Sequence, residues 1–183
     1  FKGDLIEIAI SLYNIKSIVD VGGCYGVNGG YTFHALDNGV ERGMILDGTI
    51  TGLTRERAAK YPGLELKTMD LGDREAIARL PRFDAAIIYD VLLHQVDPDW
   101  DEFLRRYADK ADTLIIYNQD FAGEETFRFI DKGLDWYLEQ EFSKFYGEET
   151  IRAWFAAHNE KDPATGKLKK DIHGLWQWGI TYM

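Results

Sequence analysis

The sequence predicts an α/β fold in which a doubly wound, mostly parallel sheet has helices on both faces. Three observations predict it. Five short apolar runs alternate with segments of helical periodicity. A glycine-rich turn follows the first run, and four of the five runs end in or just before an acid. The runs cover residues 17–21, 43–47, 64–69, 83–89 and 113–117.

The stretch from Ile18 to Gly26 joins the first strand to its helix. A short β-branched run ends at Asp20, and a run of this kind suits a buried parallel strand. The glycines that follow allow positive φ and let a ligand approach the backbone closely. A helix start adds unpaired N–H groups and the positive end of a dipole. Strand, turn and helix together predict a nucleotide-type cradle.

Helical periodicity fills the gaps between the strands. Apolar residues at three- and four-residue steps predict helices over residues 4–14, 27–36, 54–60 and 74–80. Asp97-Pro98 has the form of an N-cap followed by proline at the first helical position, so a further helix is expected to start there.

The last third of the chain is less regular. Apolar residues from Phe127 to Phe145 predict a long amphipathic helix with a break near Gly133. A second helix is expected from Ile151 to His158, and a polar turn over residues 162–167. Residues 172–182 alternate in polarity, which predicts a half-buried strand. We expect one domain over residues 1–183, with a cofactor half at about 15–120 and a substrate and sheet-edge part at about 121–183.

Composition narrows the class of protein. Hydrophobic residues make up 45% of the 183, so the chain is globular. The net charge of −10 argues against broad nucleic-acid binding. Cys24 is the single cysteine, which excludes an internal disulfide and favours a cytoplasmic location. No apolar run approaches the ~20 residues that a membrane helix needs, so we expect no membrane partner. The chain starts at Phe1 rather than Met, so a piece of a longer chain stays open. A homodimer also stays open.

The glycine spacing discriminates between nucleotide classes. A dinucleotide fingerprint needs glycines at turn positions one, three and six, and no register supplies all three. A P-loop needs Gly-Lys-Ser/Thr, and no Gly-Lys follows this strand. Asp20 followed by Gly22 and Gly26 resembles the first motif of class I S-adenosylmethionine (SAM)-dependent methyltransferases. That motif has an acid and three spaced glycines, and the middle glycine is Cys24 here.

A second resemblance covers the fourth strand. Residues 83–94 read Phe-Asp-Ala-Ala-Ile-Ile-Tyr-Asp-Val-Leu-Leu-His. This is similar to the fourth-strand motif of small-molecule methyltransferases, in which a Phe-Asp pair opens the strand and a Val-Leu-x-His turn follows it. The resemblance covers residues 17 to about 120. It implies a Rossmann-like sheet with an antiparallel C-terminal edge strand, and SAM as the cofactor.

The resemblance also implies roles for individual residues. Asp20 and the backbone of Gly22, Gly23, Cys24 and Gly26 would hold the methionine end of SAM. Asp47 would accept from the ribose hydroxyls. Asp70 and Leu71 would hold the adenine, and Tyr89 and Asp90 would line the floor beside the methyl group.

His94 is the first candidate for a catalytic base, because it follows the fourth strand and titrates near neutrality. A histidine packed at a helix start is an equally good interpretation. Asp90 and Asp120 are further candidates. No two histidines have a metal-ligand spacing, so no metal is expected.

Three functions stay open from the sequence. The first is methyl transfer from SAM to a small metabolite or carbohydrate-like acceptor. Residues 90–93 are Asp-Val-Leu-Leu rather than Asp/Asn-Pro-Pro-Tyr, which argues against amino-group methylation of bases through that motif. The second is an NAD-dependent oxidoreductase, which would use Asp47 in the same way. The third is a non-catalytic methyltransferase-like module of a larger protein, which the missing central glycine favours.

Overall fold

The structure is a computed structural model that describes residues 1–95, 98–118, 127–140, 144–157, 163 and 178–179. The chain divides into two compact units. We call residues 1–91 and 101–117 the sheet unit, and residues 92–100 and 118–183 the second unit. Each unit is described by itself. A single domain over residues 1–183 stays a prediction.

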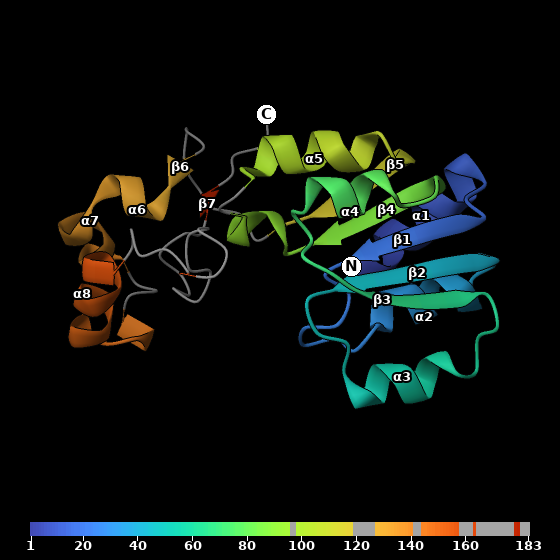
Figure 1. Cartoon of the computed structure of the whole chain (residues 1–183), viewed down its shortest axis with the longest axis horizontal. Helices are drawn as coiled ribbons and strands as arrows, with labels where there is room; N and C mark the ends of the chain where they lie inside the picture. The colour runs from blue at the N-terminus through green and yellow to red at the C-terminus, as the bar shows by residue number, and fades with distance from the viewer. Residues whose placement is uncertain (96–97, 119–126, 141–143, 158–162, 164–177, 180–183) are drawn as a thin grey trace. The chain divides into compact units, whose positions relative to one another are not determined.

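The sheet unit contains a five-stranded sheet in the order β3-β2-β1-β4-β5 (Figure 1). Every neighbouring pair is parallel. The strands are β1 (Ser17–Val21), β2 (Arg42–Asp47), β3 (Leu64–Thr68), β4 (Phe83–Tyr89) and β5 (Ala111–Tyr117). All five predicted strands are therefore confirmed, with ends that shift by one or two residues.

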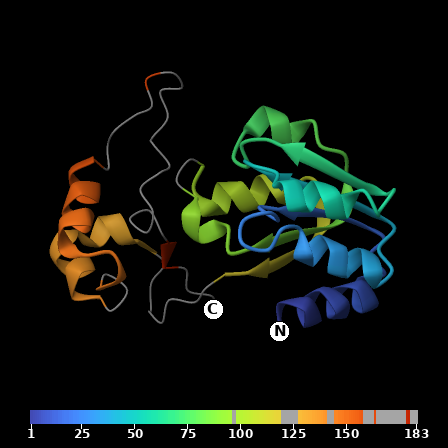
Figure 2. The same ribbon diagram turned by 90° about the horizontal axis from the view of Figure 1, so that it is seen from below.

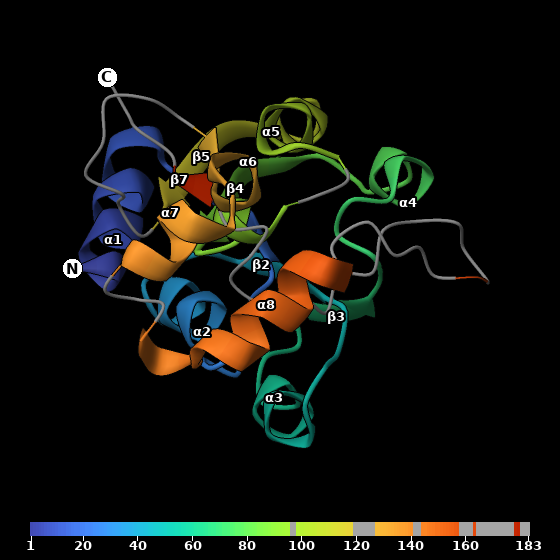
Figure 3. The same ribbon diagram turned by 90° about the vertical axis from the view of Figure 1, so that its left-hand side faces the viewer.

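Helices cover both faces of this sheet. They are α1 (Lys2–Tyr13), α2 (Gly30–Asp37), α3 (Gly52–Ala58), α4 (Arg74–Ala78) and α5 (Trp100–Ala108). Helices α1 and α2 lie on one side of the sheet, and α4 and α5 lie on the other (Figures 2 and 3). This is the doubly wound arrangement that the alternating pattern predicts. The strand order reverses between β1 and β4, where open α/β sheets form a crevice for ligands.

Burial explains why the central strands form. Every residue of β1 is buried, and β4 is buried except at Asp84. Both strands are apolar along nearly their whole length because helices cover both of their faces. The edge strand β3 is half-buried to exposed, which fits its polar residues.

Helices α2 and α5 begin later than predicted, whereas α1 and α3 each begin two residues earlier. Helix α2 begins at Gly30 rather than near Val27, because Asn28 and Gly29 take left-handed φ values of 50° and 78°. Helix α5 begins at Trp100, after the predicted Asp97-Pro98 start, and Asp97 lies outside the described residues.

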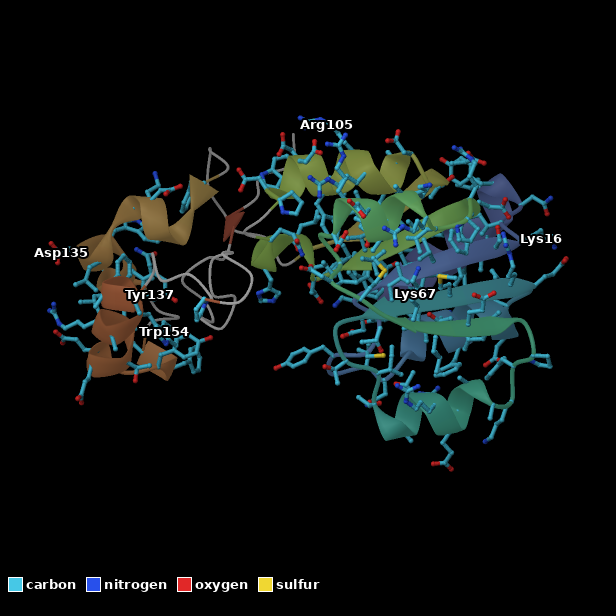
Figure 4. The ribbon with its side chains drawn as sticks, in the orientation of Figure 1. Lys16, Lys67, Arg105, Asp135, Tyr137 and Trp154 are labelled. Atoms are coloured by element: carbon cyan, nitrogen blue, oxygen red, sulfur yellow. The ribbon has the colours of Figure 1, made fainter. Side chains whose placement is uncertain are left out.

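The second unit holds short elements. They are the 3-10 turn η1 (Leu92–His94), β6 (Phe127–Arg128), α6 (Phe129–Lys132), α7 (Leu134–Glu139), α8 (Glu148–Ala157) and β7 (Trp178–Gly179). The predicted long helix from Phe127 is wrong at its start, because Phe127 pairs with Gly179 in an antiparallel two-stranded sheet. The helix does break at Gly133, whose φ is 87°. Tyr137 of α7 and Ile151 of α8 are fully buried in a small core, with Trp154 packed against it (Figure 4).

The predicted strand over residues 172–182 is described only at 178–179. There it belongs to the small sheet, and an antiparallel edge on the large sheet is not seen among the described residues. The polar turn near 162–167 is described only at Pro163. No helix in the described ranges has the length and apolar character to cross a membrane.

Asp84 fixes the start of the two central strands. Its Oδ2 accepts from the backbone N–H groups of Lys16 and Ser17, both at 2.7 Å. The Ser17 hydroxyl in turn accepts from the Asp84 N–H at 3.0 Å. Burial works against the charged carboxylate, yet these donors hold the pKa of Asp84 below its ordinary value.

We expect Asp84→Ala to lower the free energy of unfolding by about 1–3 kcal/mol, because two backbone donors lose a charged acceptor. The contribution of a carboxylate with a lowered pKa is present above the unfolded value near 4 and disappears as the pH falls. Urea unfolding at pH 7 and at pH 3 measures this. Asp112→Ala is the control, since its ion pair with Arg82 is about two-thirds exposed. If Asp84→Ala lost the same unfolding free energy relative to wild type at both pH values, the assignment would be contradicted.

Candidate functional site

The register of the parallel sheet brings the C-terminal ends of its strands to one rim. Val21 lies opposite Leu46 of β2 and Ile88 of β4. Asp47 lies opposite Thr68, and Tyr89 lies opposite Tyr117. Residues that follow these strands therefore collect at one edge of the sheet unit, as the acid spacing predicts. The predicted cofactor residues from Asp20 to Asp90 all belong to this rim.

The glycine turn after β1 is a closely packed loop. The Gly22 N–H donates to the Leu46 carbonyl at 2.8 Å, and the Gly29 N–H donates to the Gly23 carbonyl at 2.7 Å. Gly22 has a φ of 77°, and a Cβ there would lie 2.7 Å from Val91 Cγ2 and 3.7 Å from Leu71 Cδ1. The residues after β3 and β4 therefore meet above the end of β1, at the reversal of strand order.

Asp20 supports this turn from below. Its carboxylate is buried, and its Oδ2 accepts from the Thr32 hydroxyl of α2 at 2.7 Å. A Cβ on Gly23 would lie 2.4 Å from the same oxygen, so only glycine fits there. Burial raises the pKa of Asp20 to about 6, and the Thr32 hydrogen bond acts in the opposite direction.

Asp47 connects the end of β2 to the glycine turn. Its Oδ2 accepts from the Cys24 N–H at 2.9 Å, and its Oδ1 accepts from the Thr49 N–H at 3.0 Å. Asp47 is half-buried, so it keeps a face toward solvent. Cys24 itself is buried, and burial raises the pKa of its thiol. This fits a small packing residue in the turn rather than a nucleophile.

The outer part of the rim is more open. Gly26 has a φ of 72°, and a Cβ there would meet nothing within 4 Å. Asp70 Oδ1 accepts from the Gly72 N–H at 3.0 Å, and the Leu71 carbonyl accepts from the Tyr107 hydroxyl at 3.0 Å. The exposed Gly26 backbone offers donors, and the half-buried Asp70 and Asp47 offer acceptors, suited to a polar ligand.

The end of β4 carries an ion pair that sequence reasoning missed. Lys2, at the start of α1, pairs with Asp90 Oδ2. The Tyr89 hydroxyl donates to the Lys2 carbonyl at 2.9 Å. Tyr31 of α2 and Tyr117 of β5 complete the cluster through contacts with the ammonium and with the Tyr89 ring. The sequence around Lys2 does not indicate that it pairs with Asp90, because the two residues are 88 positions apart.

The predicted catalytic residues fall in different places. Asp90 lies on the rim with a left-handed φ of 54°. His94 lies on η1 in the second unit and is exposed, so its predicted role as a base stays a prediction. Asp120 lies outside the described residues.

Comparisons with known proteins identify the fold. No family model matches the sequence. No curated protein sequence matches it either. Among solved structures, the mitomycin 7-O-methyltransferase MmcR has a TM-score of 0.52 and 21% identity, over 67% of this chain and 37% of that one. A provisionally assigned RNA methyltransferase from Pyrococcus horikoshii has a TM-score of 0.50 and 17% identity, over 62% and 56%.

The similar regions span less than two thirds of the length of those two proteins. The likeness shows that the chain has the fold of class I SAM-dependent methyltransferases, as its two motifs predict.

The raised pKa of Asp20 predicts a pH dependence of stability. The native state binds this proton more tightly than the unfolded chain, so the stabilisation is complete below the unfolded value near 4. It is lost as the pH rises through the folded value of about 6. We expect wild type to lose roughly 3 kcal/mol of unfolding free energy relative to Asp20→Asn between pH 4 and pH 7. Exposed Asp37→Asn is the control, and parallel stability curves for wild type and Asp20→Asn would contradict the burial argument.

Gly23 and Gly26 of the turn predict different defects on substitution by alanine. Gly23→Ala forces a methyl group against the Asp20 carboxylate and should destabilise the fold by more than the left-handed strain of Gly26→Ala, which is about 1–2 kcal/mol. Gly48→Ala is the control, because a Cβ there meets nothing within 4 Å and its φ is unstrained. Thermal unfolding of the three variants gives the order. Equal melting temperatures for Gly23→Ala and Gly48→Ala would show that Asp20 does not pack under the turn.

Proposed function

We propose that the protein is a SAM-dependent methyltransferase that acts on a small-molecule acceptor. The observation that carries the proposal is the rim, where the Gly22–Gly26 turn lies between the carboxylates of Asp20 and Asp47 at the reversal of strand order. The methyltransferase fold supports it. The glycine spacing, which does not match the dinucleotide fingerprint, argues against NAD.

The residues of the rim fit this cofactor. SAM is a cation with a polar amino-acid end, two ribose hydroxyls and an adenine. Asp20 with the Gly22, Gly23, Cys24 and Gly26 backbone would hold the amino-acid end. Gly23 supports this assignment because its lack of a side chain brings the turn directly onto the Asp20 carboxylate.

The remaining parts of the cofactor would be held further along the rim. Asp47 would accept from the ribose, because each of its oxygens has one N–H donor in the structure and keeps a second lone pair. Asp70 and Leu71 would hold the adenine. Tyr89 and Asp90 would lie at the end of β4 beside the methyl group.

Bound SAM supplies an electrophilic methyl group with a good leaving group, so alignment provides much of the rate. The protein would hold the acceptor in line and take up its proton where the acceptor must lose one. Asp90 would be a candidate for that proton, because its Oδ1 is buried and has no hydrogen-bond partner among the described residues. His94, the first candidate base from the sequence, stays a candidate beside Asp90.

The acidic charge favours a metabolite or a carbohydrate-like acceptor over nucleic acid, because phosphate backbones bind basic surfaces. Of the two solved structures named above, MmcR is a mitomycin 7-O-methyltransferase and the other is provisionally assigned as an RNA methyltransferase. A non-catalytic module would bind the cofactor and transfer no methyl group to any acceptor, so turnover on a panel that includes RNA separates these outcomes.

Calorimetry with S-adenosylhomocysteine, SAM and NAD tests the cofactor. We expect SAM and S-adenosylhomocysteine to bind, and NAD to give no heat of binding. Asp47→Ala should weaken the binding of S-adenosylhomocysteine by about 1–3 kcal/mol, which is roughly 5-fold to 150-fold, because a charged acceptor is lost.

Asp47 also holds the Cys24 N–H, so each variant is first compared with wild type in thermal unfolding. Asp37→Ala, an exposed acid outside the rim, is the matched control. Unchanged cofactor affinity in a folded Asp47→Ala protein would remove Asp47 from the site. The absence of any binding at millimolar SAM would reject the proposed function.

A further inference from the structure

We propose that the acceptor carries an amine in its ammonium form, and that Asp90, Tyr31 and Tyr117 bind this group where the Lys2 ammonium lies in the structure. We call these three residues with Lys2 the ammonium cluster. The assignment of the ligand that bears this ammonium as the methyl acceptor rests on the proposed function. The ammonium itself is a recognition group, because a protonated nitrogen has no lone pair with which to take a methyl group. The cation site itself rests only on the contacts of the cluster.

The walls of the cluster have the chemistry of a cation site. The Lys2 Nζ lies 4.5 Å from the ring centre of Tyr117 and 5.8 Å from that of Tyr31. Both distances are within the range in which a ring face attracts an ammonium. The carboxylate of Asp90 completes the cluster through its Oδ2. An anionic ligand would meet this carboxylate and the negative faces of two rings, so the site selects for positive charge.

The rings are held in place by one another. Tyr31 packs edge-on against Tyr89 at 4.9 Å between ring centres, and Tyr89 packs edge-on against Tyr117 at 6.0 Å. The Asp90 N–H donates to the Tyr117 carbonyl at 2.8 Å. The walls are therefore fixed by the sheet and α2, independently of the ammonium between them.

Asp90 has capacity for a second donor. Its Oδ1 is buried and has no hydrogen-bond partner within the described ranges, while its Oδ2 pairs with Lys2. A buried carboxylate oxygen without a donor is unfavourable. An ammonium ligand with several N–H groups would satisfy Oδ1 as well as Oδ2.

The Lys2 side chain can leave the cluster without unfolding α1. It is 25% exposed and Asp90 is 28% exposed, so solvent reaches the pair. The Lys2 backbone is held separately by the Tyr89 hydroxyl, and α1 is anchored by buried Ile6 and Ala9. Burial opposes the charge, but the hydrogen bond and charge of Asp90 raise the pKa of Lys2. Lys2 therefore acts as an internal cation that an ammonium ligand replaces.

The test uses probes of one size and three charges: n-butylammonium, n-butanol and butyrate. Binding to the full chain is measured by titration calorimetry or by ligand-observed NMR. We expect n-butylammonium alone to bind. Lys2→Met keeps the side-chain length and removes the competing charge, so it should tighten n-butylammonium binding by about tenfold. Tyr117→Leu should weaken the binding of n-butylammonium, and binding of n-butanol should stay undetectable.

Lys16→Met is the matched control, because Lys16 pairs with exposed Glu41 at the opposite, N-terminal edge of the sheet (Figure 4). This substitution should leave the affinity of every probe unchanged. Equal binding of all three probes would overturn the proposal, and so would unchanged n-butylammonium affinity in folded Lys2→Met. S-adenosylhomocysteine is titrated in parallel. Its failure to bind, with charge selection intact, would reject the proposed function and leave the cation site standing.

Discussion

The buried carboxylate of Asp20 is the interaction on which the site depends. It lies at the end of a fully buried strand, accepts from Thr32 of α2 and packs directly against Gly23. These contacts fix the turn between strand and helix, and no residue larger than glycine fits at position 23. The position of this turn also places the Cys24 N–H within hydrogen-bond distance of Asp47. Burying an acid at this point is unfavourable for the free protein, as its raised pKa shows.

Acidic side chains collect at the rim because of the sheet topology. All five strands of the sheet unit are parallel, so each chain segment that leaves a strand emerges at the same edge. Acids at successive strand ends are thereby brought together and need compensation. Backbone N–H groups provide it for Asp47 and Asp70, and an ammonium provides it for Asp90. Asp47 and Asp70 accept from backbone N–H groups of loops at the rim, whereas Asp90 pairs with the side chain of Lys2 on α1.

Much of the sheet unit could be predicted from the sequence, because strand and helix periods are local properties of the chain. The predictions failed where backbone conformation or pairing depends on contacts. Asn28 and Gly29 delay the start of α2 through left-handed φ values, although an Asn-Gly pair is a recognisable turn signal. Phe127 has helical spacing to its neighbours but forms a strand, because Gly179 supplies a partner that periodicity cannot reveal.

The sequence by itself determined the alternation of strands and helices, the glycine turn and the acids at or just after the ends of four strands. These follow from side-chain polarity and glycine content over a few residues. Only the tertiary structure decided that Gly23 rests on Asp20, that Lys2 pairs with Asp90 and that Tyr31 and Tyr117 flank that ammonium. Such contacts join residues from separate elements, and their geometry is set by sheet register and helix packing, which no local pattern encodes.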